Sequence, residues 1–145
     1  MSRAAERFAT DLRRYRRCMD VPAESTRRCV EVMYTLFTEL IKGLASDLGT
    51  PEAQQAKRSG LWNVEMLDEA IDKIADAYWN ISHAIIESWD KLWELYLSKE
   101  PEASEVSDLY RELERLAQEL LSARPSRHMM RQRGRGGRRR ARGRG

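Results

Sequence analysis

The sequence predicts an all-α protein built on a long antiparallel helical hairpin and followed by a basic tail. Apolar residues recur at intervals of three and four, and no stretch alternates with a period of two over a useful length. The 145 residues include only 4 Pro and 2 Cys, and this length suits one domain plus a tail. We therefore expect an all-helical oligomerisation and assembly domain over residues 1–123 and a disordered, Arg/Gly-rich nucleic-acid-binding tail over residues 124–145.

The first expected helix covers residues 3–19 and has two contrasting faces. Its apolar side carries residues at spacings of four, four, three and four, namely Ala4, Phe8, Leu12, Tyr15 and Met19. The opposite side of the helical wheel carries Arg3, Arg7, Arg13, Arg14 and Arg17. These arginines either form a second basic surface for nucleic acid or pair with acidic residues of the body, and the sequence leaves both readings open.

A second helix is expected after Pro22, and it should run to about Asp47. Gly49 is typical of a helix end, and Thr50 and Pro51 are typical of the cap and first residue of a short helix that ends near residues 59–60. The apolar stripe of the second helix comprises Cys29, Met33, Leu36, Leu40 and Leu44.

The segment from residue 63 to residue 98 has the strongest helical pattern and contains neither Pro nor Gly. If it is continuous, it forms one helix of about 36 residues and ~54 Å. Pro101 should end it, and a last helix is expected over about residues 105–122. The apolar positions of the long segment, which mostly follow a four-three spacing, are Leu67, Ile71, Ile74, Tyr78, Ile81, Ile85, Trp89, Leu92 and Tyr96.

These nine apolar positions predict an oligomer interface. A helix of ~54 Å is longer than a compact body of this chain length is wide. The second and third helices also have wide apolar faces, which a single neighbouring helix cannot cover. We therefore expect a homodimer in which two hairpins form a four-helix bundle. The alternative is a four-helix bundle inside one chain, with the third segment kinked near Ser88.

Charge is distributed very unevenly along the chain. Residues 29–123 contain 8 basic and 19 acidic residues, a net charge of −11, although the whole chain has a net charge of +3. After Glu119 no acid remains, and the tail carries Arg124, Arg127, Arg131, Arg133, Arg135, Arg138, Arg139, Arg140, Arg142 and Arg144. An acidic body repels a polyanion, so nucleic acid must be contacted by the ends of the chain. We expect RNA or DNA to be bound by the tail without sequence specificity.

Other classes of function find little support in the sequence. Cys18 and Cys29 form no CxxC pair, so we expect reduced thiols and no zinc site. No nucleophile, metal cluster or phosphate-binding loop is recognisable, and we expect neither enzymatic activity, nor a cofactor, nor a small-molecule substrate. No apolar stretch is long enough to span a membrane, and the N-terminal residues lack a signal-peptide pattern. We expect no membrane partner and an intracellular location.

One local stretch is similar to a known family. Trp79-Asn80-Ile81-Ser82, followed by Leu92-Trp93-Glu94-Leu95-Tyr96-Leu97, resembles a Trp-x-x-Ile-Ser and a later Leu-Glu-Tyr-Leu stretch of hepadnavirus-type core (capsid) proteins. The resemblance covers residues 24–98 in layout, and it implies a hairpin dimer whose C-terminal arginine-rich tail packages RNA. The chain departs from that family in lacking a Pro-rich segment after the hairpin and Ser-Pro repeats in the tail, and in having an extra helix over residues 105–122.

Together these patterns favour a viral capsid- or nucleocapsid-like structural protein. Its helical body would self-assemble and its arginine tail would package nucleic acid, which places it in the virion and in the cytoplasm or nucleus of a host. The alternative is a regulatory RNA-binding adaptor, such as a viral RNA export factor, a silencing suppressor or a nucleolar protein with an RGG-type tail. Such an adaptor forms no shell.

Overall fold

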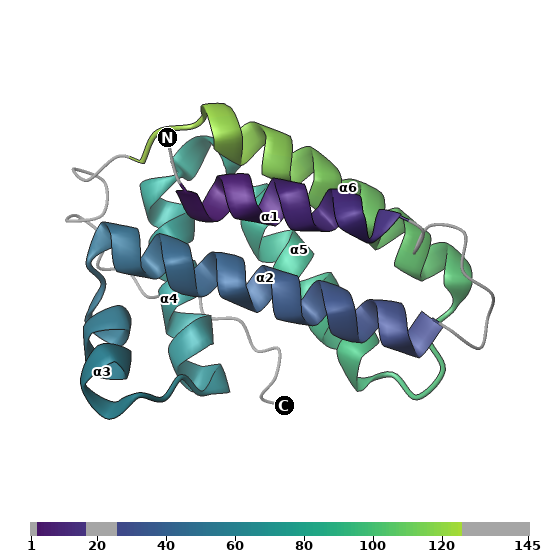
Figure 1. Cartoon of the computed structure of the whole chain (residues 1–145), viewed down its shortest axis with the longest axis horizontal. Helices are drawn as coiled ribbons and strands as arrows, with labels where there is room; N and C mark the ends of the chain where they lie inside the picture. The colour runs from purple at the N-terminus through teal and green to yellow at the C-terminus, as the bar shows by residue number, and fades with distance from the viewer. Residues whose placement is uncertain (1–2, 17–25, 126–145) are drawn as a thin grey trace.

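The part of the chain described by the computed structural model, residues 3–16 and 26–125, is helical and contains no strand (Figure 1). The all-α prediction is therefore confirmed for these residues. Six α-helices and one 3-10 turn follow one another as α1 (Arg3–Arg14), α2 (Thr26–Leu48), α3 (Pro51–Ser59), α4 (Val64–Ala77), η3 (Trp79–Ile81), α5 (Ser82–Leu97) and α6 (Ala103–Ser122).

Short capping signals set the ends of α2 and α3, as the sequence predicts, and a further cap sets the start of α4. Gly49 and Gly60 follow α2 and α3 with φ angles of 70° and 72°, a left-handed conformation that glycine adopts without strain. The Thr50 side chain accepts a hydrogen bond from the Ala53 amide at 3.2 Å and so caps α3. Asn63 caps α4 in the same way, because its side chain accepts a hydrogen bond from the Met66 amide at 2.8 Å.

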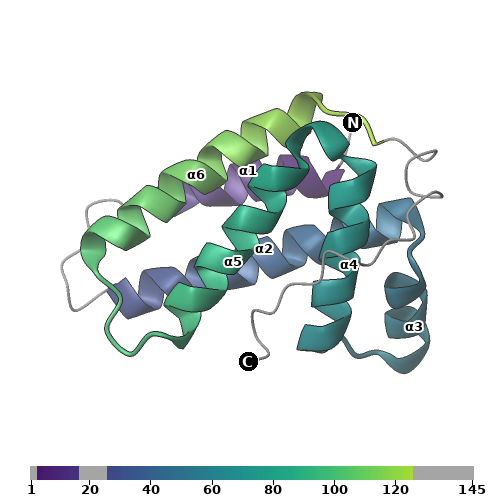
Figure 2. The same cartoon turned by 180° about the vertical axis from the view of Figure 1, so that it is seen from behind.

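The expectation of one continuous helix over residues 63–98 is wrong. Tyr78, with φ −109° and ψ 56°, ends α4, and the short turn η3 separates it from α5. The break lies ten residues before the kink considered at Ser88, in a stretch of aromatic, Asn and β-branched residues with modest helix propensity. It turns α5 back beside α4, so both halves of the segment pack against the same neighbour, α2 (Figure 2).

The helices form two layers, and α2 belongs to one of them. Figures 1 and 2 show α1 and α2 on one face of the molecule and α4 and α5 on the opposite face. α2 packs against α1, α4 and α5, whereas α1 has its main contacts with α2 and α6. α3 lies at one end, where it packs against α2 and α4. The central position of α2 explains why its apolar surface is too wide for a single neighbour.

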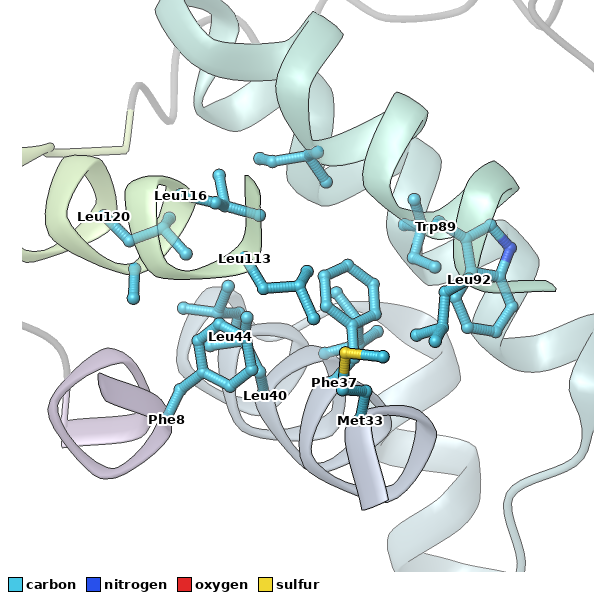
Figure 3. Packing of buried hydrophobic residues seen from close by; sticks show 14 of the residues in the cluster. Phe8, Met33, Phe37, Leu40, Leu44, Trp89, Leu92, Leu113, Leu116 and Leu120 are labelled. Carbon is cyan, nitrogen blue, oxygen red and sulfur yellow. The ribbon is translucent and has the colours of Figure 1, made fainter. Parts of the chain in front are cut away.

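The space between the layers is filled by one hydrophobic core. Figure 3 shows side chains of α1 and α2 meeting those of α5 and α6 in this space. Trp89 lies between the layers with 0% of its surface exposed, and it stacks on Phe37 with ring centroids 5.9 Å apart. The labelled members of the cluster are Phe8, Met33, Phe37, Leu40, Leu44, Trp89, Leu92, Leu113, Leu116 and Leu120.

The nine positions expected at a dimer interface lie largely inside this core. Ile81 and Tyr96 are half-buried and pack against it. The other seven are buried in the single chain: Leu67, Ile71, Ile74, Tyr78, Ile85, Trp89 and Leu92. The helices of one chain therefore cover the surface that a second copy was expected to cover. A bundle shared between two copies is not seen here, and dimerisation stays a prediction.

Candidate nucleic-acid interface

The tail begins at the exposed C-terminal end of α6. Arg124 follows the last helical residue, Ser122, by two positions, and its side chain is exposed. It is the one predicted tail arginine within the part of the chain that the structure describes. The nine others lie outside the described residues, and they are Arg127, Arg131, Arg133, Arg135, Arg138, Arg139, Arg140, Arg142 and Arg144.

The second predicted basic surface is the outer side of α1. Four residues of α1 are buried against the core, namely Ala5, Phe8, Ala9 and Leu12. The arginines share the rest of the helix circumference with Glu6, Thr10 and Asp11, and Arg3, Arg7, Arg13 and Arg14 are all exposed. Arg16, which directly follows the helix, is exposed as well. Arg17 lies outside the described residues.

α1 is held on the body by close packing and by two polar contacts. A Cβ atom placed on Gly43 of α2 would lie 2.6 Å from the Cβ of Ala4, so glycine is required for the observed approach of the two helices. The hydroxyl of Tyr110 on α6 donates a hydrogen bond to the carbonyl oxygen of Leu12. Arg16 Nη1 lies 2.9 Å from Glu114 Oε2, which also joins the end of α1 to α6.

Burial also affects the ionisation of Tyr110. Removal of its side chain from water raises its pKa to about 12, and the nearby carboxylate of Glu114 adds to this rise. Arg16 acts in the opposite direction and lowers the pKa of the same group. The hydroxyl therefore stays protonated at neutral pH, and it remains a donor to the Leu12 carbonyl.

Few acidic groups neutralise the arginines of α1. Arg14 approaches Asp11 of the same helix at 4.0 Å, and Arg16 pairs with Glu114. Within residues 3–16 and 26–125, Arg3, Arg7 and Arg13 form no ion pair. The sequence left two readings open, and the geometry favours exposed, available cations over neutralisation by the acidic body.

The start of α1 and the root of the tail lie at the same end of the molecule. α1 packs against α6, and Figures 1 and 2 both show the beginning of α1 beside the end of α6. The first turn of α1 and the last turn of α6 are therefore close in the fold although they are far apart in the sequence. The same views place α4 and α5 on the opposite face from α1.

The two faces of the body differ in charge. Residues 3–16 contain five arginines and two acids, a net charge of +3. Residues 51–105, which include α4 and α5, contain twelve acids and five basic residues, a net charge of −7. The acidic character found in the sequence is therefore concentrated away from α1, and a polyanion approaching the body is directed to the α1 side.

A groove of about 390 Å³ runs between α1 and α2, next to the arginine side of α1. Arg3 and Arg7 line one wall, and Lys42 lines the other. Lys42 is paired with Glu39 at 3.5 Å, and Asp11 and Asp47 also line the groove. The groove thus has mixed charge, and the outer surface of α1 is a better site for an anion than the groove itself.

Sequence reasoning did not single out Arg115, which is one of several exposed arginines outside the predicted sets. Arg115 on α6 precedes the tail root by nine residues and is exposed. Within the described residues it forms no ion pair, whereas Arg111 pairs with Asp108 at 3.4 Å. Sequence reasoning missed Arg115 because it lies in an acidic helix. The sequence shows it between Glu114 and Glu119 and does not indicate which way each side chain points.

Neither a metal site nor a membrane-spanning helix is found in the described part of the chain. No three His, Cys, Asp or Glu side chains there are placed to hold a metal ion, and no helix there is long and apolar enough to cross a membrane. Cys29 is disulfide-bonded, so the expectation of a reduced thiol is wrong at this position. The chain's other cysteine, Cys18, lies outside the described residues.

The fold and the site define an all-helical protein with one exposed basic face and a basic C-terminal extension. No protein-family model, curated protein sequence or solved structure matches this chain. The similarity to hepadnavirus-type core proteins therefore stays a prediction.

Proposed function

We propose that this protein is a nucleocapsid-like structural protein that self-assembles through its helical body and packages RNA or DNA with its arginine-rich tail. The observation that carries the proposal is the segregation of charge. Residues 124–145 contain ten arginines and no acid, whereas residues 29–123 have a net charge of −11. A polyanion is attracted by the tail and repelled by most of the body, so packaged nucleic acid is held on one side of the protein.

The choice of arginine suits this role. A guanidinium group donates two parallel hydrogen bonds to phosphate oxygens and also stacks on exposed bases. Such contacts do not read sequence, because they go to the backbone and to the faces of the bases. If all ten arginines contact phosphates of a single strand, the logarithm of the binding constant should fall with the logarithm of salt concentration with a slope of up to about −7.

The helical body has a hydrophobic core of its own. Within residues 3–16 and 26–125, this core is formed by buried residues between Ala5 and Leu120. Truncation after Ala123 should therefore leave the helices intact and remove only the tail. This separation makes the tail's contribution measurable.

The test compares the full chain with this truncated variant. We expect the purified full chain to carry nucleic acid, seen as a raised ratio of absorbance at 260 to 280 nm, and to bind a labelled oligouridylate with a steep salt dependence. The truncated variant should keep its helical circular dichroism spectrum and lose most of this binding. Undiminished binding by the truncated variant would overturn the proposal.

The adaptor function is a second candidate, and one observation favours it. Seven of the nine apolar positions expected between two copies are buried inside one chain, so these seven positions are covered without a partner copy. Light scattering with and without RNA, at low and high salt, separates the two candidates. Particles much larger than a dimer favour the nucleocapsid-like protein, and a monomer or dimer under all conditions favours the adaptor.

A further inference from the structure

α1 presents a row of arginines directly away from the core. On a helical wheel, Arg3, Arg7 and Arg14 lie opposite the buried residues Phe8 and Leu12. Arg3 and Arg7 are one helical turn apart, and the row from Arg3 to Arg14 spans ~16 Å. Arg13 lies next to this row and is also exposed. Such a row faces solvent along the whole length of the helix.

These arginines contribute little to holding α1 in place. The helix is attached through its apolar face, the close contact of Ala4 with Gly43 and the hydrogen bond from Tyr110 to the Leu12 carbonyl. Arg3 and Arg7 form no ion pair within the described part of the chain. The four arginines of α1 and the following Arg16 repel one another, and within the described part of the chain Arg3 and Arg7 have no compensating acidic partner. A bound polyanion would supply the missing counter-charge.

The position of α1 connects this row to the tail. Because the start of α1 lies beside the end of α6, a strand held at the end of α6 reaches the start of α1 without crossing the acidic face formed by α4 and α5 (Figures 1 and 2). The mixed charges of the α1–α2 groove, which include Asp11, Glu39 and Asp47, direct the strand over the outer surface of α1.

We propose that the outer face of α1 continues the nucleic-acid site of the tail, with Arg3 and Arg7 contacting phosphates of a single strand that the tail also holds. This inference rests on the proposed nucleic-acid binding and extends it from residues 124–145 to the folded body. The tail supplies most of the charge, and α1 gives the bound strand a fixed surface and direction. The body then becomes a part of the binding site.

The test uses full-length protein and a labelled oligouridylate. One variant combines Arg3→Gln with Arg7→Gln, and the matched control combines Lys57→Gln with Arg58→Gln on α3. All four residues are exposed, and both variants remove two charges. Glutamine is a good helix former, so circular dichroism should be unchanged for both. The salt slope is the slope of the logarithm of the binding constant against the logarithm of salt concentration. We expect the α1 variant to lower its magnitude by about 1.4 and the α3 control to leave it unchanged.

A third variant, Lys42→Gln, distinguishes the outer face from the neighbouring groove. We expect its salt slope to equal that of the wild type, because Lys42 already pairs with Glu39. If the α1 and α3 variants have equal salt slopes, the contribution of α1 is refuted while binding by the tail stands. If Lys42→Gln instead lowers the magnitude of the salt slope by about 0.7, as the loss of one phosphate contact does, the strand lies in the groove and the proposed path is wrong. Failure of the tail itself is detected separately, by truncation after Ala123.

Discussion

α1 and α5 both pack against α2, but they do so with different kinds of side chain. Phe37 of α2 lies between them, with its ring 6.1 Å from Phe8 of α1 and 5.9 Å from Trp89 of α5. On the α5 side the contact continues through large rings. Tyr34 stacks on Tyr96 with centroids 3.9 Å apart, and Trp93 lies beside both. On the α1 side the helices approach through Ala4 and Gly43.

The two helices also differ on their outer surfaces. α1 carries unpaired arginines, whereas α5 belongs to the acidic face. The apolar side of each helix therefore determines how it packs, and the outer side can carry either positive or negative charge. Aromatic stacking attaches α5 to α2, whereas small side chains in close contact attach the basic α1.

The largest expected effect is on the aromatic attachment of α5. Trp89→Ala should lower the free energy of unfolding by about 3–5 kcal/mol, because it removes a fully buried ring and leaves a cavity. Trp79→Ala is the matched control, since 59% of that side chain is exposed, and its effect should stay within about 0.5 kcal/mol. Urea unfolding followed by circular dichroism measures both. Equal losses for the two variants would contradict the assigned core.

A smaller effect is expected where α1 approaches α2. Gly43→Ala places a Cβ within 2.6 Å of Ala4, and it should cost about 1–3 kcal/mol although alanine is the better helix former. Adding Ala4→Gly should relieve the clash, so the double variant should be more stable than the two single effects predict when added. Thermal unfolding of the four proteins gives this coupling. Simple additivity would mean that the two helices are not in close contact.

The smallest expected effect concerns the hydrogen bond between α6 and α1. Tyr110→Phe should cost about 1 kcal/mol at neutral pH. The pKa of Tyr110 rises from 10.0 to about 12, so the unfolded chain loses this proton at a lower pH than the folded protein. The contribution of this hydrogen bond to the free energy of unfolding is therefore complete below pH 10 and is lost as the pH rises through 12.

The measurement is therefore the stability difference between wild type and Tyr110→Phe as a function of pH. The difference should shrink between pH 10 and pH 12. The exposed Tyr15→Phe is the control and should show no comparable trend. A difference that grows with pH would contradict the burial of the Tyr110 hydroxyl.

Much of the local structure was predictable from short signals. Gly49, Thr50 and Pro51 mark helix ends in the sequence and occupy those positions in the structure. The amphipathic pattern of α1 also predicted which residues face outward. Both kinds of signal depend only on residues within a turn or two, which is why the sequence contains them.

The break after Tyr78 was not predictable in this way. No Pro or Gly marks it, and the apolar spacing continues through it. A periodic pattern predicts which side of a helix will be buried, but it does not predict which other helix will cover that side. Folding α5 back beside α4 covers both halves with α2, and this long-range gain outweighs the local cost of interrupting a helix.

By itself, the sequence determined the helical class, most helix ends and the separation of basic from acidic segments, because these depend on composition and on neighbours along the chain. Only the tertiary structure decided that the apolar stripe of residues 67–92 is covered within one chain. It also decided that the start of α1 lies beside the end of α6 and that Arg3, Arg7 and Arg13 form no ion pair within the described residues. These properties arise from distances between residues far apart in the sequence, which are fixed when the helices pack.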